Sequence, residues 1–83
     1  MGLKIDLRFF ALYREVVGKE RMQMEVGEEA TPAQIWDELC QNFTKLAEQL
    51  DTWKVAVNGE YADSYAILRE GDEVAFIPPL SGG

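Results

Sequence analysis

The sequence contains no histidine and only one cysteine among its 83 residues. Without histidine, the chain has no imidazole to act as a general base near neutral pH, to activate a nucleophile or to bind a metal ion. A single cysteine allows neither an internal disulfide nor a cluster of thiolate metal ligands. These absences make a self-contained enzyme the weakest functional class for this sequence.

Basic residues are also scarce, because eight lysines and arginines stand against fifteen aspartates and glutamates, a formal charge of −7. Nucleic acid phosphates and anionic lipids repel such a protein, so we expect neither nucleic acid nor membrane as a partner. No apolar run approaches the length of a membrane span, and the first residues do not resemble a secretory signal. We therefore expect a cytoplasmic protein whose protein partners offer basic or neutral docking surfaces.

Hydrophobic residues make up 47% of the sequence, enough for one core and one domain. Alternation predicts strands over residues 3–10, 21–26 and 73–77. The Asn58-Gly59 turn signal joins a strand over residues 55–57 to a short return strand over residues 60–62. We therefore expect a mixed sheet of four to five strands. Strands combined with a helix on one face indicate an α+β fold. Because the first and last strands can lie side by side in the sheet centre, we expect the β-grasp, or ubiquitin-like, arrangement.

The main helix has a strong start signal, in which Thr31 caps the first turn, Pro32 takes the first helical position and Gln34 completes a capping box. An apolar stripe follows at helical spacing: Ile35, Trp36, Leu39, Cys40 and Phe43. Two shorter helical pieces are expected, one over residues 12–17 that ends at Gly18, and one that includes Leu46, Ala47 and Leu50.

The sequence ends with Pro78, Pro79, Leu80, Ser81, Gly82 and Gly83. Two prolines stop the last strand and favour an extended exit from the sheet. The two glycines have no side chain, so a narrow channel in a partner can close around their backbone. We expect a domain over residues 1–77 and an extended tail over residues 78–83, although a Gly-Gly end is also compatible with a simple flexible terminus.

The sequence resembles the small subunit of molybdopterin synthase, the sulfur carrier of molybdenum cofactor biosynthesis. The resemblance spans nearly the whole chain. It is most specific over residues 71–76 (Gly-Asp-Glu-Val-Ala-Phe), together with the Pro-Pro and Gly-Gly pairs that follow. Other matching positions are Phe9, Phe10, Ala11, Arg14, Glu15, Gly18, Ala56, Val57 and Asn58. The family often has a second phenylalanine where this chain has Ile77, and that exchange keeps the position apolar.

The resemblance implies that a partner enzyme uses ATP and magnesium to adenylate the carboxylate of Gly83, next to Gly82. A sulfur donor enzyme then converts the acyl-adenylate into a thiocarboxylate. The tail delivers this sulfur to cyclic pyranopterin monophosphate inside the large synthase subunit, in a heterotetramer with a central large-subunit dimer. The small subunit is then a sulfur-donating cosubstrate that binds no metal and no cofactor of its own.

A docking face is predicted by strand parity, which places Phe10 and Ile77 on the sheet face away from the core. Exposed apolar side chains on a small domain often mark a partner surface. The resemblance adds Tyr61, because the matching hairpin residue of the family packs against the large subunit. We predict these three residues as interface anchors, with ordinary sheet packing as the alternative. The tail completes the partner-binding set: Pro78, Pro79, Leu80 and Ser81.

Other functions of the same fold remain open. The carried sulfur could serve thiazole synthesis or tRNA thiolation, and a ubiquitin-like modifier would instead join its C-terminus to a target lysine. A pure interaction module would not need the tail. Cys40 is expected to be a structural residue of the apolar helix stripe, because no histidine is present to activate it. The sequence assigns no role to Trp53.

Overall fold

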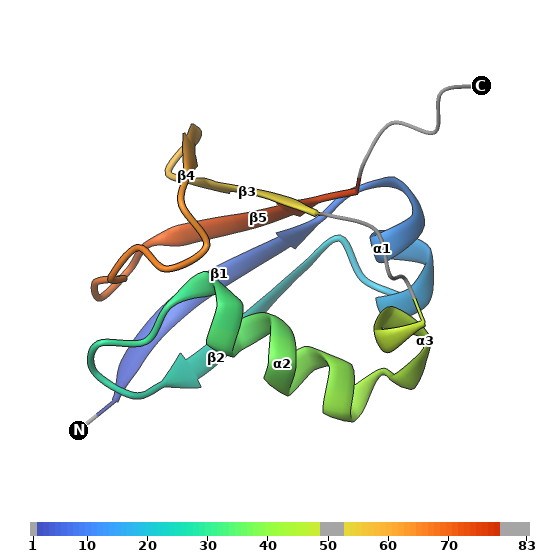
Figure 1. Ribbon diagram of the computed structural model, residues 1–83, viewed down its shortest axis with the longest axis horizontal. Coiled ribbons are helices and arrows are strands. Elements are labelled where there is room, and N and C mark those ends of the chain that lie inside the picture. The colour runs from blue at the N-terminus through green and yellow to red at the C-terminus, as the bar shows by residue number, and fades with distance from the viewer. Residues whose placement is uncertain (1, 49–52, 79–83) are drawn as a thin grey trace.

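The computed structural model describes residues 2–48 and 53–78, and its elements follow the predicted order (Figure 1). The strands are β1 (Leu3–Phe9), β2 (Arg21–Val26), β3 (Lys54–Val57), β4 (Glu60–Ala62) and β5 (Glu73–Ile77). The helices are α1 (Ala11–Val17), α2 (Pro32–Asn42) and α3 (Thr44–Ala47). The short second helical piece is therefore present as α3, while Leu50 lies outside the described residues.

The sheet has the strand order β2-β1-β5-β3-β4. The first and last strands lie side by side in its centre and run parallel, with Leu7 opposite Val74 and Phe9 opposite Phe76. The other three strand pairs are antiparallel. This is the predicted β-grasp arrangement, in which the two ends of the sequence supply the two central strands.

The core lies between one face of this sheet and the helices (Figure 1). Ile5, Leu7 and Phe9 alternate as the buried residues of β1, and Val74, Ala75 and Phe76 are all buried in β5. Leu7, Val74 and Phe76 expose no surface at all. Full burial of such a side chain stabilises the fold by roughly 1.5–3 kcal/mol. The helices cover these strands with buried apolar side chains from α1, α2 and α3: Tyr13, Val17, Ile35, Trp36, Leu39 and Leu46. The predicted α2 stripe is confirmed, with Cys40 and Phe43 at its half-buried margin.

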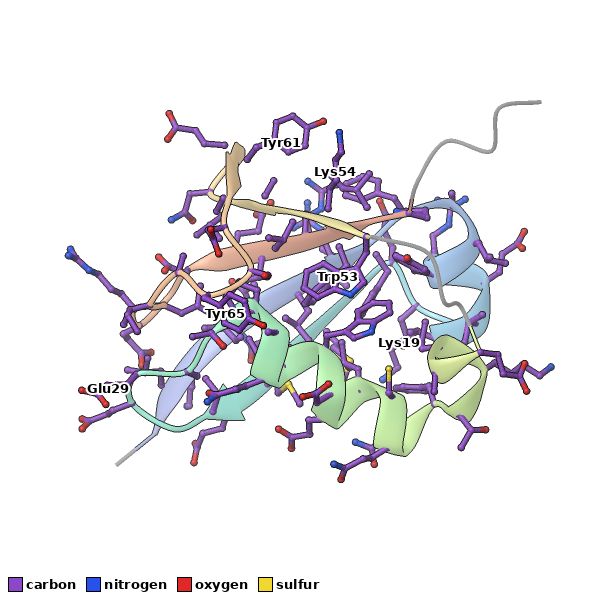
Figure 2. The ribbon with its side chains drawn as sticks, in the orientation of Figure 1. Lys19, Glu29, Trp53, Lys54, Tyr61 and Tyr65 are labelled. Atoms are coloured by element: carbon purple, nitrogen blue, oxygen red, sulfur yellow. The ribbon has the colours of Figure 1, made fainter. Side chains whose placement is uncertain are left out.

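An aromatic cluster closes the core beneath the end of β5. The ring of Trp36 lies 5.1 Å from that of Trp53 and 5.3 Å from that of Phe76. Trp53 also meets Phe76 edge-on at 5.2 Å. Figure 2 shows Trp53 on the helix side of the sheet. Trp53, for which the sequence predicted no role, therefore helps to hold the last core residue before the chain leaves the sheet.

The turns and caps follow from local sequence. Gly18 ends α1 in the left-handed region with φ of 84°, and its N–H donates to the carbonyl of Arg14. Asn58 and Gly59 both have positive φ, as required for the tight turn that joins β3 to β4. At the start of α2, the hydroxyl of Thr31 accepts from the Gln34 N–H at 3.3 Å, and the Gln34 side chain accepts from the Thr31 N–H at 3.4 Å. The predicted capping box is confirmed.

We expect Thr31→Ala to lower the free energy of unfolding by about 1 kcal/mol, because the first turn of α2 loses its cap. Thr31→Ser keeps the accepting oxygen and is expected to lose clearly less. Urea denaturation of the two variants measures the difference. Equal losses in both would show that the hydroxyl does not stabilise this helix.

Candidate functional site

The sheet face away from the helices, which we call the open face, carries a row of side chains across four strands. Residues directly opposite in neighbouring strands share a face. Ala75 of β5 lies opposite Arg8 of β1 and Ala56 of β3, and Ala56 lies opposite Tyr61 of β4. Ile77 lies opposite Lys54 in the next row. The two alanines in the middle of the first row keep this part of the open face flat.

The three predicted anchors all belong to this open face. Tyr61 leaves 74% of its surface exposed and Phe10 leaves 36%, while Ile77 is half-buried. Phe10 directly follows β1 and, with extended backbone, forms the N-cap position of α1. The guanidinium carbon of Arg8 lies 5.1 Å from the centre of the Phe10 ring, which places that ring beside the row. The structure thus brings the anchors onto one surface, and their role in binding stays a prediction.

Two cations lie among these apolar groups, although the chain as a whole is acidic. Arg8 is neutralised by Glu73 at 3.4 Å and by Glu20 at 3.9 Å. The Lys54 ammonium lies 5.8 Å from the centre of the Tyr61 ring, and Figure 2 shows both side chains on the side away from the helices. Among the described residues, Lys54 has no ion pair. A cation with no ion pair among the described residues therefore lies beside Tyr61.

Sequence reasoning missed Arg8 and Lys54 as members of this surface, although parity contained the signal. Arg8 alternates with the buried Leu7 and Phe9, and Lys54 precedes the buried Val55. Beside Lys54 the surface is hollowed by about 310 Å³ at the β3–β4 edge. The hollow is lined by Trp53, Lys54, Val55, Tyr61, Ala62 and Ser64. A side chain of a partner can enter this hollow next to the exposed tyrosine.

The predicted tail begins where β5 ends. Ile77 is the last residue of that strand, and Pro78, which is half-buried, follows it. Five of the predicted site residues lie outside the described residues: Pro79, Leu80, Ser81, Gly82 and Gly83. The central strand β5 therefore ends at Ile77, and the tail over residues 78–83 stays a prediction.

Within residues 2–48 and 53–78, no group of three or more carboxylates and thiols lies close enough to hold a metal ion. No helix in the same ranges is long and apolar enough to cross a membrane. Cys40 lies half-buried on α2 against the core. Burial raises the pKa of the Cys40 thiol, and the neighbouring Asp37 carboxylate raises it further. Both effects disfavour the thiolate, so the geometry supports the structural role predicted for this cysteine.

Comparisons with known proteins extend over nearly the whole chain. The ThiS family model matches residues 7–83. The molybdopterin synthase sulfur carrier subunit of Arabidopsis thaliana is 35% identical, covering 99% of this chain and 85% of that protein. The subunit of the same name from Haemophilus influenzae is also 35% identical, and the match covers 95% of this chain and 99% of that protein.

Solved structures show the same fold. The Haloferax volcanii protein HVO 2177 is 31% identical with a TM-score of 0.88, covering 99% of this chain and 88% of that one. SAMP1 from the same organism is 30% identical with a TM-score of 0.82, and the match covers 96% of this chain and 99% of that one. The ubiquitin of Caldiarchaeum subterraneum, at 18% identity and a TM-score of 0.62, covers 100% of both chains and shares the fold alone.

We expect the Cys40 thiol to react with iodoacetamide several times more slowly in the folded protein than in the urea-unfolded chain at the same mildly alkaline pH. Its pKa is raised by folding, so the thiolate appears at higher pH in the folded state. Asp37→Asn removes one cause and is expected to speed the reaction, whereas Glu38→Gln serves as the control on the next residue. A reaction as fast in the folded as in the unfolded chain would contradict this environment.

Proposed function

Because this chain belongs to the ThiS family, we propose that it is a sulfur carrier in molybdenum cofactor biosynthesis. The observation that carries the proposal is the match to sulfur carrier subunits of molybdopterin synthase along almost the entire length of the chain. The end of β5 supports it, because Pro78 follows this strand of the sheet centre directly.

The proposed chemistry takes place on the carboxylate of Gly83. A carboxylate is a poor electrophile, so an activating enzyme first joins it to the α-phosphate of magnesium-bound ATP and releases pyrophosphate. Hydrosulfide supplied by a donor enzyme then attacks the acyl carbon, and AMP leaves. The product is a thiocarboxylate, in which one carboxylate oxygen has been replaced by sulfur. ATP is bound by the activating enzyme, and this chain needs no cofactor or metal of its own.

The loaded carrier then delivers its sulfur inside the large subunit of molybdopterin synthase. In this proposal Phe10, Tyr61 and Ile77 anchor the open face on that subunit, and residues 78–83 form the tail that enters its active site. The precursor is cyclic pyranopterin monophosphate, and two deliveries complete one dithiolene. The assembly is a heterotetramer around a large-subunit dimer, and we propose that it works in the cytoplasm.

A ubiquitin-like modifier is the second candidate, favoured by the similarity to SAMP1 of Haloferax volcanii. A second structure from that organism, 28% identical to this chain, is of small archaeal modifier protein 1. Both functions begin with adenylation of a C-terminal carboxylate. They differ in the attacking atom, which is sulfur in a carrier and the amine of a target lysine in a modifier. Lysine-linked adducts in a cell extract supplied with ATP would favour the modifier. A carrier for thiazole synthesis or tRNA thiolation differs only in the acceptor of the sulfur.

Incubation with the activating enzyme, magnesium-ATP and a sulfur source is expected to replace one oxygen of the intact protein by sulfur, as measured by mass spectrometry. Deletion of Gly83 should abolish this change, because the reactive carboxylate is then one residue short. The deletion should leave the urea denaturation midpoint unchanged. Loading that survives the deletion would exclude chemistry at this carboxylate.

Docking on the large subunit is tested with Tyr61→Ala. We expect the dissociation constant to rise about tenfold or more, as is typical of an aromatic anchor. The free energy of unfolding should change by less than about 0.5 kcal/mol, because the side chain is exposed. Tyr65→Ala is the matched control, since Tyr65 is 75% exposed and belongs to the loop that contacts α2. Calorimetric titration that finds equal losses in the two variants would remove Tyr61 from the interface.

A further inference from the structure

The strand β2 is an open edge of the sheet. It pairs with β1 on one side, and no strand among the described residues pairs with its other side. An open edge presents unpaired N–H and C=O groups that another strand can use. The six residues of β2 make it twice as long as β4, which is the opposite edge. β2 is therefore the edge better suited to pair with a further strand.

The backbone groups that face outward can be identified from the pairing with β1. The Phe9 N–H donates to the carbonyl of Glu20 at 3.0 Å, so this opposed pair is hydrogen-bonded. Hydrogen-bonded and non-bonded pairs alternate along an antiparallel ladder. Glu20, Met22 and Met24 therefore direct their backbone groups toward β1. The residues that direct theirs outward, to the free side, are Arg21, Gln23 and Glu25.

The side chains of β2 are self-complementary about Gln23. When a second copy of the strand is laid antiparallel with the two Gln23 residues opposed, Arg21 lies opposite Glu25 of the second copy, and Glu25 lies opposite its Arg21. Met22 then lies opposite Met24 of the second copy on the other face. Opposite charges and apolar pairs are the cross-strand combinations that stabilise a sheet.

We propose that the free chain forms a two-fold symmetric dimer in which β2 pairs with β2 of a second copy in this register. In this register Arg21, Gln23 and Glu25 each lie opposite an outward-facing residue of the second copy, and each opposed pair forms two backbone hydrogen bonds. A shift by two residues in either direction leaves one of the three outside β2. A shift by one residue brings outward-facing backbone groups opposite inward-facing ones.

Local charges favour the same partner. Arg21 lies opposite Arg8 of β1, and the two ion pairs of Arg8 go to Glu20 and Glu73. Among the described residues, Arg21 has no ion pair of its own, and neither has Glu25. The second copy supplies a carboxylate to Arg21 and a guanidinium to Glu25. These two symmetric ion pairs act against the general repulsion between two chains that each carry −7.

The other face of the new strand pair continues the hydrophobic core. Met22 and Met24 are half-buried and pack at the margin of that core. In this register Met22 of one copy and Met24 of the other form a non-hydrogen-bonded pair. In such a pair the opposed Cα atoms approach to about 4.5 Å and the side chains pack closely. The dimer therefore covers Met22 and Met24 at the margin of the core and extends the sheet across the two-fold axis.

Sedimentation equilibrium of the free, full-length chain measures the dimer and its response to charge exchange. Arg21→Glu opposes two carboxylates at both symmetric pairs and is expected to weaken dimerisation about tenfold or more. Glu25→Arg opposes two guanidinium groups with a similar loss. Lys45→Glu in α3 makes the same charge change as Arg21→Glu away from β2 and should leave the dimer nearly unchanged.

Two combinations restore complementary pairs. The double variant Arg21→Glu with Glu25→Arg keeps the charge of −7 and should dimerise like the wild type. An equimolar mixture of the two single variants should form a heterodimer, because each opposed pair then joins a carboxylate to a guanidinium. A wild-type chain that stays monomeric at millimolar concentration overturns the proposal, as does a dimer that does not respond to these exchanges.

Amide hydrogen exchange provides an independent readout of the register. The N–H groups of Arg21, Gln23 and Glu25 should exchange rapidly at low concentration and become protected as the dimer forms, while Met22 and Met24 are protected throughout. Gln23→Pro removes an outward-facing N–H, which an edge strand tolerates, and should abolish the dimer while the chain stays folded. Protection that does not depend on concentration would contradict pairing at this edge.

Discussion

The parallel pairing of β1 with β5 is the constraint on which the rest of the structure depends. It places the beginning and the end of the sequence in the centre of one sheet, where Leu7 faces Val74 and Phe9 faces Phe76 in the core. A central strand opens only when the whole domain unfolds. Because Pro78 follows this strand directly, the proposed tail begins at the end of a buried central strand, beside the open face.

The sequence was sufficient to predict the elements whose signals are local. Alternation predicted β1, β2 and β5, and the Asn58-Gly59 turn predicted the hairpin of β3 and β4. Thr31 with Gln34 predicted the start of α2, because a capping box depends only on neighbouring residues. Trp53 escaped prediction because its role arises from Trp36 and Phe76, which are distant in sequence and meet it only in the folded core. Tertiary burial of this kind leaves no periodic signal in a segment between elements.

The candidate site was predictable in part for the same reason. Parity placed Phe10 and Ile77 on the open face, whereas Tyr61 entered through resemblance, because a three-residue strand carries almost no pattern of its own. Ala56 and Ala75, which make the row flat, attract no attention until the register sets them opposite each other. Net charge was the least informative guide, since it does not reveal that a lysine, Lys54, lies beside Tyr61.

A small domain that docks through one sheet face, as proposed for this chain, also has to protect its sheet edges, because an unpaired edge invites open-ended association. The two edges here differ in that respect. β4 is only three residues long, which limits its use as a template, whereas β2 is longer and self-complementary. Pairing of β2 about a two-fold axis uses the same surface on both copies, so the association closes at two chains instead of growing into a filament.

The anchor Tyr61 lies at the opposite edge of the sheet and stays accessible in such a pair. The proposed pairing uses the β2 edge, whereas the proposed docking uses the open face from Phe10 across Ile77 to Tyr61.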